Sequence, residues 1–155
     1  MLVLYKPELE DLWFREELMG DPNTMSYNHA SGGTIPFPKE KWASWYQKWI
    51  VPEESKRYYR YLQNKETKQF VGEIAYYLDD SKQIYIADII IYDKYRGQGY
   101  GTKGLNLLCE AAKDHHLTVL YDDIAIDNPS IALFLKNGFT IDYQTDDIIM
   151  VKRVL

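Results

Sequence analysis

Two hydrophobic patterns along the chain predict two kinds of element. Apolar residues three or four positions apart, as in Trp42, Trp45, Tyr46 and Trp49, place one apolar stripe along a helix. Short apolar runs between polar turns predict strands, and Ile89-Ile90-Ile91 is continuous enough for a strand buried on both faces. Helices are predicted at residues 8–19, 39–50, 102–115 and 128–137. Strands are predicted at residues 2–5, 57–64, 69–77, 84–92, 118–123, 141–143 and 148–152.

The order of these elements predicts a mixed α/β fold, in which an antiparallel meander leads into a β-α-β unit. A chain of 155 residues has the usual length of one domain. Residues 20–38, between the first two helices, contain several glycines and prolines. This segment is too long for a plain connection, and loops of that length in compact domains tend to be functional.

Composition and charge narrow the classes of partner. The chain has 18 Lys and Arg against 23 Asp and Glu, a net charge of −5, so it lacks the basic surplus that nucleic acids and anionic membranes attract. Cys109, the single cysteine, lies on the apolar stripe of residues 102–115 and fits the core of a protein from a reducing compartment. With neither a membrane-length apolar run nor a signal-peptide pattern, we expect a cytoplasmic protein. No ligand spacing suggests a metal site.

A glycine-rich turn carries the clearest chemical signal. Arg96-Gly97-Gln98-Gly99-Tyr100-Gly101 directly follows a predicted buried strand and opens a helix. Glycines let the backbone curl, and the first N–H groups of a helix lack intrahelical partners, so this turn suits phosphate oxygens. A tight turn with nothing bound is the plainer alternative. A Walker loop is excluded because no Lys-Ser/Thr pair follows, and a dinucleotide fold would need more βαβ units than the residues after Asp123 allow.

Arg96, Gly99 and Gly101 match the pattern R/Q-x-x-G-x-G/A, which resembles the phosphate-binding motif of the GNAT family of acyl-CoA-dependent N-acetyltransferases. Residues 128–139, NPSIALFLKNGF, resemble the second signature of that family. The resemblance implies one domain over residues 1–155, with an acceptor half (1–78) and an acetyl-CoA half (79–155). It also implies a seven-stranded, mostly antiparallel sheet with four helices and a splayed central parallel pair.

The same resemblance implies acetyl-CoA as cosubstrate and assigns residues to it. The pyrophosphate would bind the backbone N–H groups of the glycine turn, and the pantetheine arm would lie along the strand before that turn. The residues so implied are Ile89, Ile90, Ile91, Arg96, Gly97, Gln98, Gly99, Tyr100, Gly101, Thr102, Asn128 and Phe134. Asn128 would bond the pantetheine, and it also suits the start of the helix at 128–137.

Phe134 departs from the pattern of the family. Many members have a tyrosine there, which protonates the leaving thiolate, whereas phenylalanine has no proton to transfer. A thiolate with a thiol pKa near 8.5 leaves readily, so water, Tyr100 or Tyr143 remain as proton donors.

Direct attack by an amine needs a group that removes a proton from the ammonium form. Asp88 is the first candidate for this general base, because it is the acid within an otherwise apolar strand. Glu73, on the preceding strand, is the second candidate. The acidic pair Asp122-Asp123 is expected on solvated surface, where it would also make the mouth of a site attractive to cations.

Aromatic residues make up 15% of the chain, and many gather between residues 13 and 49, where the resemblance places the acceptor. Aromatic faces in an acidic protein suit a cation. We therefore predict acetyl transfer to the primary amine of a small cationic molecule in a ternary complex, with Tyr27, His29 and Trp45 in contact with it. An amine of a protein or peptide, or a CoA-binding module without transfer, remains as an alternative. The tryptophan stripe can equally pack the helix at 39–50 onto the sheet. A homodimer is left open.

Overall fold

The computed structural model describes residues 1–52, 54 and 56–155. Within them, a seven-stranded sheet has the order β1-β2-β3-β4-β5-β7-β6. Only β4 and β5 run parallel, and the other neighbours are antiparallel. The strands are β1 (Leu2–Tyr5), β2 (Arg57–Asn64), β3 (Phe70–Asp79), β4 (Ile84–Ile91), β5 (Val119–Ala125), β6 (Thr140–Gln144) and β7 (Ile148–Val154). The predicted strands are therefore confirmed, with ends shifted by one or two residues.

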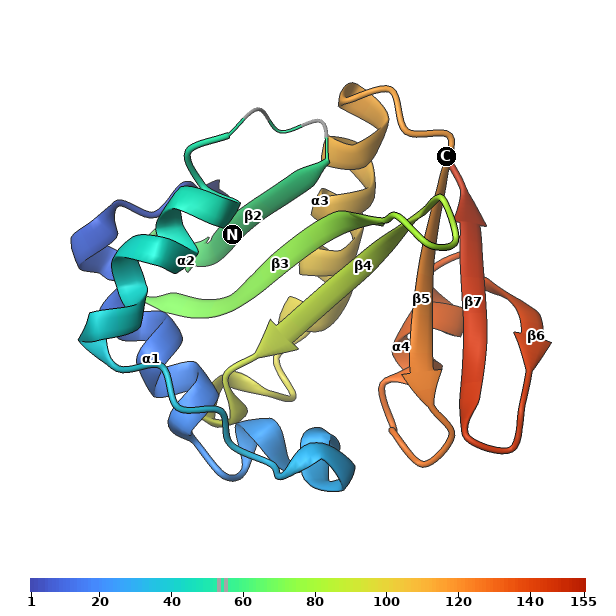
Figure 1. Ribbon diagram of the computed structural model, residues 1–155, viewed down its shortest axis with the longest axis horizontal. Coiled ribbons are helices and arrows are strands. Elements are labelled where there is room, and N and C mark those ends of the chain that lie inside the picture. The colour runs from blue at the N-terminus through green and yellow to red at the C-terminus, as the bar shows by residue number, and fades with distance from the viewer. Residues whose placement is uncertain (53, 55) are drawn as a thin grey trace.

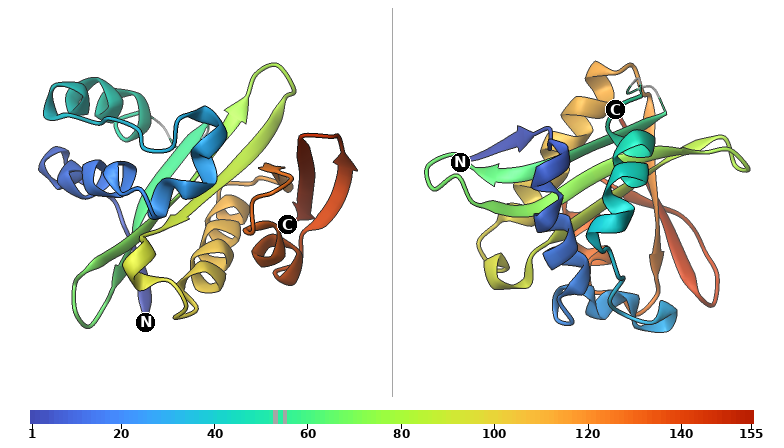
Figure 2. Two further views of the ribbon diagram at one scale, coloured as in Figure 1. Left: turned by 90° about the horizontal axis from the view of Figure 1, so that it is seen from below. Right: turned by 60° about the vertical axis from the view of Figure 1, so that its left-hand side comes forward.

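Helices cover both faces of the sheet (Figure 2). The α-helices are α1 (Trp13–Gly20), α2 (Trp42–Trp49), α3 (Tyr100–Asp114) and α4 (Ile131–Lys136). Short 3₁₀ helices are η1 (Leu9–Leu12), η2 (Thr24–Ser31), η3 (Lys39–Lys41) and η4 (Asp93–Tyr95). One core packs α3 and α4 on one face, and a second, aromatic core packs α1 and α2 on the other.

The sequence pattern located the helices better than it located their starts. The predicted helix at 8–19 begins as η1, with a reciprocal capping box between Glu8 and Asp11. The predicted helix at 128–137 begins later, since α4 starts at Ile131, and the Asn128 side-chain oxygen accepts the Ser130 N–H at 2.9 Å in the turn that leads into it. Gly138 follows α4 with φ +89°, as expected for the residue that ends a helix. The long loop at 20–38 contains η2.

The parallel pair is joined at one end and open at the other. Ile86 pairs with Tyr121, and this is the one register pair between β4 and β5 in the described part of the chain. On its other side, β5 pairs with β7 continuously from Val119 to Ala125. Figure 1 shows β4 and β5 diverging toward their carboxyl ends. The predicted splay is confirmed, and it leaves an edge of β4 without a strand beside it.

Trp42, Trp45 and Trp49 pack partly buried against the aromatic core beneath α2. The tryptophan stripe therefore joins α2 to the sheet. Cys109 is buried in the opposite core, as predicted. None of the described helices is both long and apolar enough to cross a membrane.

Gly72 lies on β3 directly against the backbone of β4, and replacing it should destabilise the fold. A Cβ at Gly72 would lie 2.4 Å from the Ile90 carbonyl oxygen, which belongs to rigid backbone. We expect Gly72→Ala to lower the free energy of unfolding by about 3 kcal/mol, as overpacking does. Gly20→Ala is the matched control, because nothing lies within 4 Å of a Cβ there. Urea denaturation measures both, and equal stability of the two variants would contradict the expectation.

Candidate active site

A cavity of about 760 Å³ opens where β4 and β5 separate. Its walls are the carboxyl halves of those two strands, the glycine turn, η2 and the start of α4. Ligands in open α/β sheets bind at this kind of place, outside the carboxyl ends of parallel strands. Residues of the predicted site that line it are Tyr27, His29, Asp88, Ile89, Ile90, Ile91, Arg96, Gly97, Gly99, Tyr100, Gly101, Asn128 and Phe134.

The three glycines of the turn serve different purposes. Gly97 and Gly99 have φ of +80° and +81°, a left-handed conformation that side chains disfavour. Gly101 lies inside α3, and a Cβ there would meet Leu133 of α4 at 3.2 Å, so this glycine allows close helix packing. The Lys103 N–H donates to the Gly99 carbonyl at 3.2 Å. The N–H groups before it belong to the first turn of α3, where a helix leaves donors for an anion.

Two residues of the predicted cofactor site lie at the margin of the cavity. Gln98 is exposed. The Thr102 hydroxyl accepts a 3.5 Å hydrogen bond from the Asn137 amide, and its carbonyl accepts one from Asn106 at 3.0 Å. Neither residue belongs to the cavity lining, so their side chains stabilise α3 and α4 or face solvent. Their backbone N–H groups remain part of the predicted phosphate turn.

Asp88 is open to the cavity from the middle of β4. Its register partner on β3 is Ala75, and Ala75 and Ile90 belong to the aromatic core, so Asp88 lies on the sheet face that carries α1 and α2. Burial within the protein and the negative charge of Glu73 raise the pKa of Asp88 to about 6, although Arg15 opposes the shift. A carboxylate with this pKa is ionised at neutral pH and still basic enough to accept a proton.

Asp122 and Asp123, on β5, line the same cavity. The expectation that this pair lies on solvated surface is therefore wrong for Asp122, which is half-buried. Burial and the charges of Asp88 and Asp123 raise its pKa well above the usual range. Asp122 is not on open surface because β4 and β5 separate, so that the carboxyl end of β5 forms a wall of the cavity opposite Asp88. The cavity thus has acidic groups on both of its strands.

Glu73, the second candidate base, is buried on β3 and already paired. Its Oε1 accepts a 2.7 Å hydrogen bond from Arg15 Nη1 and another from the Tyr59 hydroxyl. It is not part of the cavity lining. The structure therefore places Glu73 behind Asp88, where it acts on Asp88 through its charge.

Trp45 faces a cation that belongs to the protein itself. The Arg15 guanidinium carbon lies 4.6 Å from the centre of the Trp45 ring, 5.2 Å from that of Phe37 and 5.8 Å from that of Tyr59. Trp45 does not line the cavity. Trp45 of α2, Tyr59 of β2 and Phe37 of the loop before η3 thus surround Arg15 and its ion pair with Glu73, in the place where the sequence suggested a substrate cation.

Tyr27 and His29 reach the cavity from η2. Burial and the charges of Asp88 and Glu73 raise the pKa of Tyr27, which keeps its hydroxyl protonated. His29 Nε2 lies 2.9 Å from Asp127 Oδ2, in the connection between β5 and α4. This contact spans 98 positions of sequence and joins the two sides of the cavity lining.

The proton donors considered for the leaving thiolate are separated by the structure. Tyr100 lines the cavity, and its hydroxyl accepts a 3.0 Å hydrogen bond from Asn64 Nδ2. Tyr143 is exposed on β6, outside that lining. Phe134 forms part of the wall and packs edge-on against Phe139.

Sequence reasoning missed Arg15 and Asp127 as neighbours of the site. Arg15 had no signal, because its importance depends on contacts with residues 22 to 58 positions further along the chain. Asp127 directly precedes Asn128, and its position beside the second signature was a signal that could have been used.

A glycine turn at the head of α3 and a splayed parallel pair are the features expected of an acetyltransferase domain. The chain belongs to the acetyltransferase (GNAT) family, whose model matches residues 12–139.

Among curated proteins, the chain is similar to an uncharacterized N-acetyltransferase of Methanocaldococcus jannaschii, with 23% identity over 126 residues. The match covers 76% of this chain and 54% of the relative, so the chain spans about half the length of that protein.

Two solved structures are similar in fold across nearly the whole chain. A GNAT-family acetyltransferase from Bacillus anthracis has a TM-score of 0.79 at 18% identity, covering 99% of this chain and 94% of that one. Spermidine N-acetyltransferase from Vibrio cholerae, in complex with CoA and spermine, has a TM-score of 0.79 at 19% identity, covering 99% and 95%.

Proposed function

We propose that the protein transfers the acetyl group of acetyl-CoA to a primary amine of a small, multiply charged cation, by direct attack in a ternary complex. The observation that carries this proposal is the acidic cavity wall, formed by Asp88 of β4 and by Asp122 and Asp123 of β5, beside the glycine turn. Carboxylates on two separated strands can bind two ammonium groups of one molecule, whereas a monoamine has only one such group to bind.

The residues present fit acetyl-CoA. The left-handed Gly97 and Gly99 curl the backbone ahead of α3, and the N–H groups there suit a pyrophosphate. The open edge of β4 at Ile89–Ile91 can pair with the amides of the pantetheine arm. When bound, the cosubstrate supplies the thioester. Its carbonyl would accept a hydrogen bond from a β4 backbone N–H, which stabilises charge that develops on oxygen.

Asp88 would take a proton from the ammonium group of the acceptor, leaving the amine lone pair free to attack the acetyl carbon. With a pKa of about 6, Asp88 is ionised at neutral pH and is a stronger base toward the ammonium proton than an ordinary carboxylate. The thiolate leaves and takes a proton from water or from Tyr100, whose hydroxyl is at the cavity wall.

A contact between two sides of the cavity lining favours a small molecule over a protein. η2 contributes Tyr27 and His29 to the wall, and His29 contacts Asp127 on the opposite side of the opening. A folded protein or a long peptide would have to displace this contact. The spermidine N-acetyltransferase with the similar fold also supports a polyamine-like acceptor.

A thiol-release assay with acetyl-CoA tests the proposal. The panel pairs each diamine or polyamine with a monoamine of equal length, and it includes a lysine peptide and an aminoglycoside. We expect kcat/KM for the diamine to exceed that of its monoamine partner by about tenfold, the value of one added ion pair in a partly buried site. A preference for the peptide would overturn the choice of acceptor. Acetyl-CoA binding without thiol release from any amine would indicate a binding module instead.

A further inference from the structure

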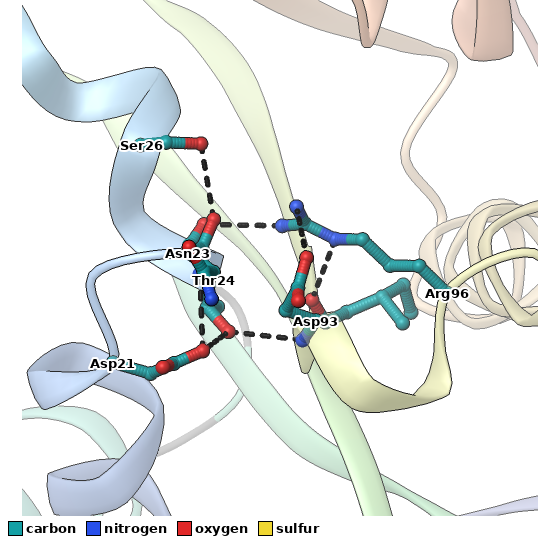
Figure 3. Close-up of polar contacts among 7 residues, drawn as sticks. Asp21, Asn23, Thr24, Ser26, Asp93 and Arg96 are labelled. Carbon is teal, nitrogen blue, oxygen red and sulfur yellow. Dashed lines mark hydrogen bonds and ion pairs between the residues drawn. The ribbon is translucent and has the colours of Figure 1, made fainter.

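The side chain of Arg96 is turned toward the acceptor segment η2, although Arg96 stands at the head of the phosphate motif. Its Nη2 donates to the Thr24 carbonyl at 3.0 Å, and its Nε donates to the Ile91 carbonyl at 3.1 Å. Its Nη1 lies 3.4 Å from Asp93 Oδ1. Figure 3 shows the guanidinium between η4 and η2. All three guanidinium nitrogens thus have a protein partner.

Thr24 forms a second hydrogen bond between η2 and η4. Its side chain is fully buried, and its Oγ1 accepts the Asp93 N–H at 2.9 Å (Figure 3). The same hydroxyl donates to Asp21 Oδ2, which also accepts the Thr24 N–H at 3.1 Å. The hydroxyl therefore both donates and accepts a hydrogen bond, and Thr24 is bonded to the first backbone N–H of η4 as well as to the side chain of Arg96.

The consequence for the acceptor follows from the position of Thr24 in η2. Thr24 is the first residue of this 3₁₀ helix, and Tyr27 of the cavity wall is three residues further on. Side chains three positions apart in a 3₁₀ helix lie on the same side, so Tyr27 moves with Thr24. On its other flank, η4 lies between β4, which carries Asp88, and the glycine turn.

We propose that Arg96 is a positioning residue for the acceptor, which with Thr24 clamps η2 to the segment between Asp88 and the phosphate turn. In this role the backbone at residue 96 serves acetyl-CoA, whereas the side chain serves the amine by fixing Tyr27 relative to Asp88. The inference rests on the proposed function in one respect, namely that η2 contacts the acceptor.

Three variants separate this role from phosphate binding. Thr24→Val keeps the size of the side chain and removes the hydroxyl without changing any charge. Arg96→Lys keeps the positive charge but cannot reach three acceptors with one flat group. Thr24→Ser keeps the hydroxyl and is the rescue control. Thermal unfolding checks that each variant folds, and Arg96→Lys changes a side chain that is 42% exposed and so leaves the core intact.

Steady-state kinetics with the best amine and calorimetric titration with acetyl-CoA give the decisive comparison. We expect Thr24→Val and Arg96→Lys each to raise the KM for the amine about tenfold, the effect of a lost buried or charged hydrogen bond. The Kd for acetyl-CoA should stay within about twofold, and Thr24→Ser should behave like the natural protein. The double variant Thr24→Val/Arg96→Lys should add little to either single change, because both break one clamp.

The opposite pattern would overturn the proposal. If Arg96→Lys weakens acetyl-CoA binding tenfold and leaves the KM for the amine unchanged, its guanidinium serves the phosphates. An unchanged KM in Thr24→Val would also reject the clamp.

Amide hydrogen exchange of residues 24–31 provides a readout that needs no turnover. Protection of these amides should fall in Thr24→Val and Arg96→Lys but not in Thr24→Ser. If the natural protein acetylates none of the amines, the proposed function fails while this measurement still decides the clamp. Unchanged protection would reject the clamp by itself.

Discussion

Replacing Asp88 by asparagine should lower kcat/KM for the amine acceptor by about 10²–10⁴-fold at pH 7, the range for loss of a general base. Asparagine has nearly the same shape and cannot accept the proton. The natural protein should show a rate that rises with pH through about 6, where Asp88 loses its proton. This rise should be absent from Asp88→Asn. Initial rates between pH 5 and 10 measure both effects.

Two controls distinguish the loss of a general base from other causes of a lower rate. Near pH 10 much of the amine is already unprotonated in solution, so the gap between the two proteins should narrow there. Asp123→Asn changes an acid in the same cavity that is more exposed than Asp122, and it should keep the rise near pH 6. If Asp88→Asn retains an unchanged profile, the base is another group.

Asp88→Asn should also stabilise the fold at neutral pH. The folded-state pKa of about 6 lies above the ordinary value near 3.9, so between these values the unfolded chain releases a proton that the folded chain still holds. Ionisation of Asp88 therefore lowers stability as pH rises from about 4 to 6, and the full cost persists above pH 6. The Tm of Asp88→Asn should exceed that of the natural protein at pH 8 and equal it below pH 4. A lower Tm at pH 8 would contradict the assigned environment.

Replacing Gly99 by valine should weaken acetyl-CoA binding by about 10²-fold. The residue has φ +81°, which costs a side chain roughly 1–2 kcal/mol, and a β-branched side chain more. Relaxation of that strain would rotate the N–H groups at the head of α3 away from the phosphates. Each charge-assisted hydrogen bond lost there adds roughly 1.5–3 kcal/mol. Isothermal titration with acetyl-CoA gives the Kd directly.

Gly33→Val is the matched control for Gly99→Val. Gly33 has φ +75°, and nothing lies within 4 Å of a Cβ at either glycine. Both variants therefore carry similar backbone strain, but Gly33 follows η2 rather than preceding α3. Gly33→Val should leave the Kd for acetyl-CoA unchanged. Equal losses in the two variants would mean that strain alone, and not the phosphate turn, explains the effect.

The glycine turn and its place between β4 and α3 could be predicted from sequence because the signals are local. A glycine turn between a buried strand and a helix has its chemistry in consecutive residues, and Gly97, Gly99 and Gly101 are adjacent in both sequence and space. The hydrophobic patterns that predict helices and strands are also local, because they join residues three or four positions apart in a helix and two apart in a strand. The start of the fourth helix was misplaced, since α4 begins at Ile131 rather than directly after Asn128.

The acceptor side could not be predicted to the same depth, because its contacts join distant parts of the chain. Asp122 reads as surface in sequence and becomes a cavity wall only because β5 separates from β4 after Tyr121. Trp45 was expected to contact the substrate, but the cation that lies over its ring in the structure is Arg15. No pattern in residues 13–49 distinguishes a cage for a ligand from a cage for an internal arginine.

The occupied aromatic cage also bears on how inhibitors of this site should be designed. A ligand that seeks to stack on Trp45 would first have to expel Arg15, and expulsion would leave Glu73 as a buried charge without its ion-pair partner. Flat aromatic cations are therefore poor starting points on the α2 side. Flexible chains with two amines, spaced to reach Asp88 and Asp122 and tethered to a pantetheine-like arm along β4, match the groups that the cavity offers.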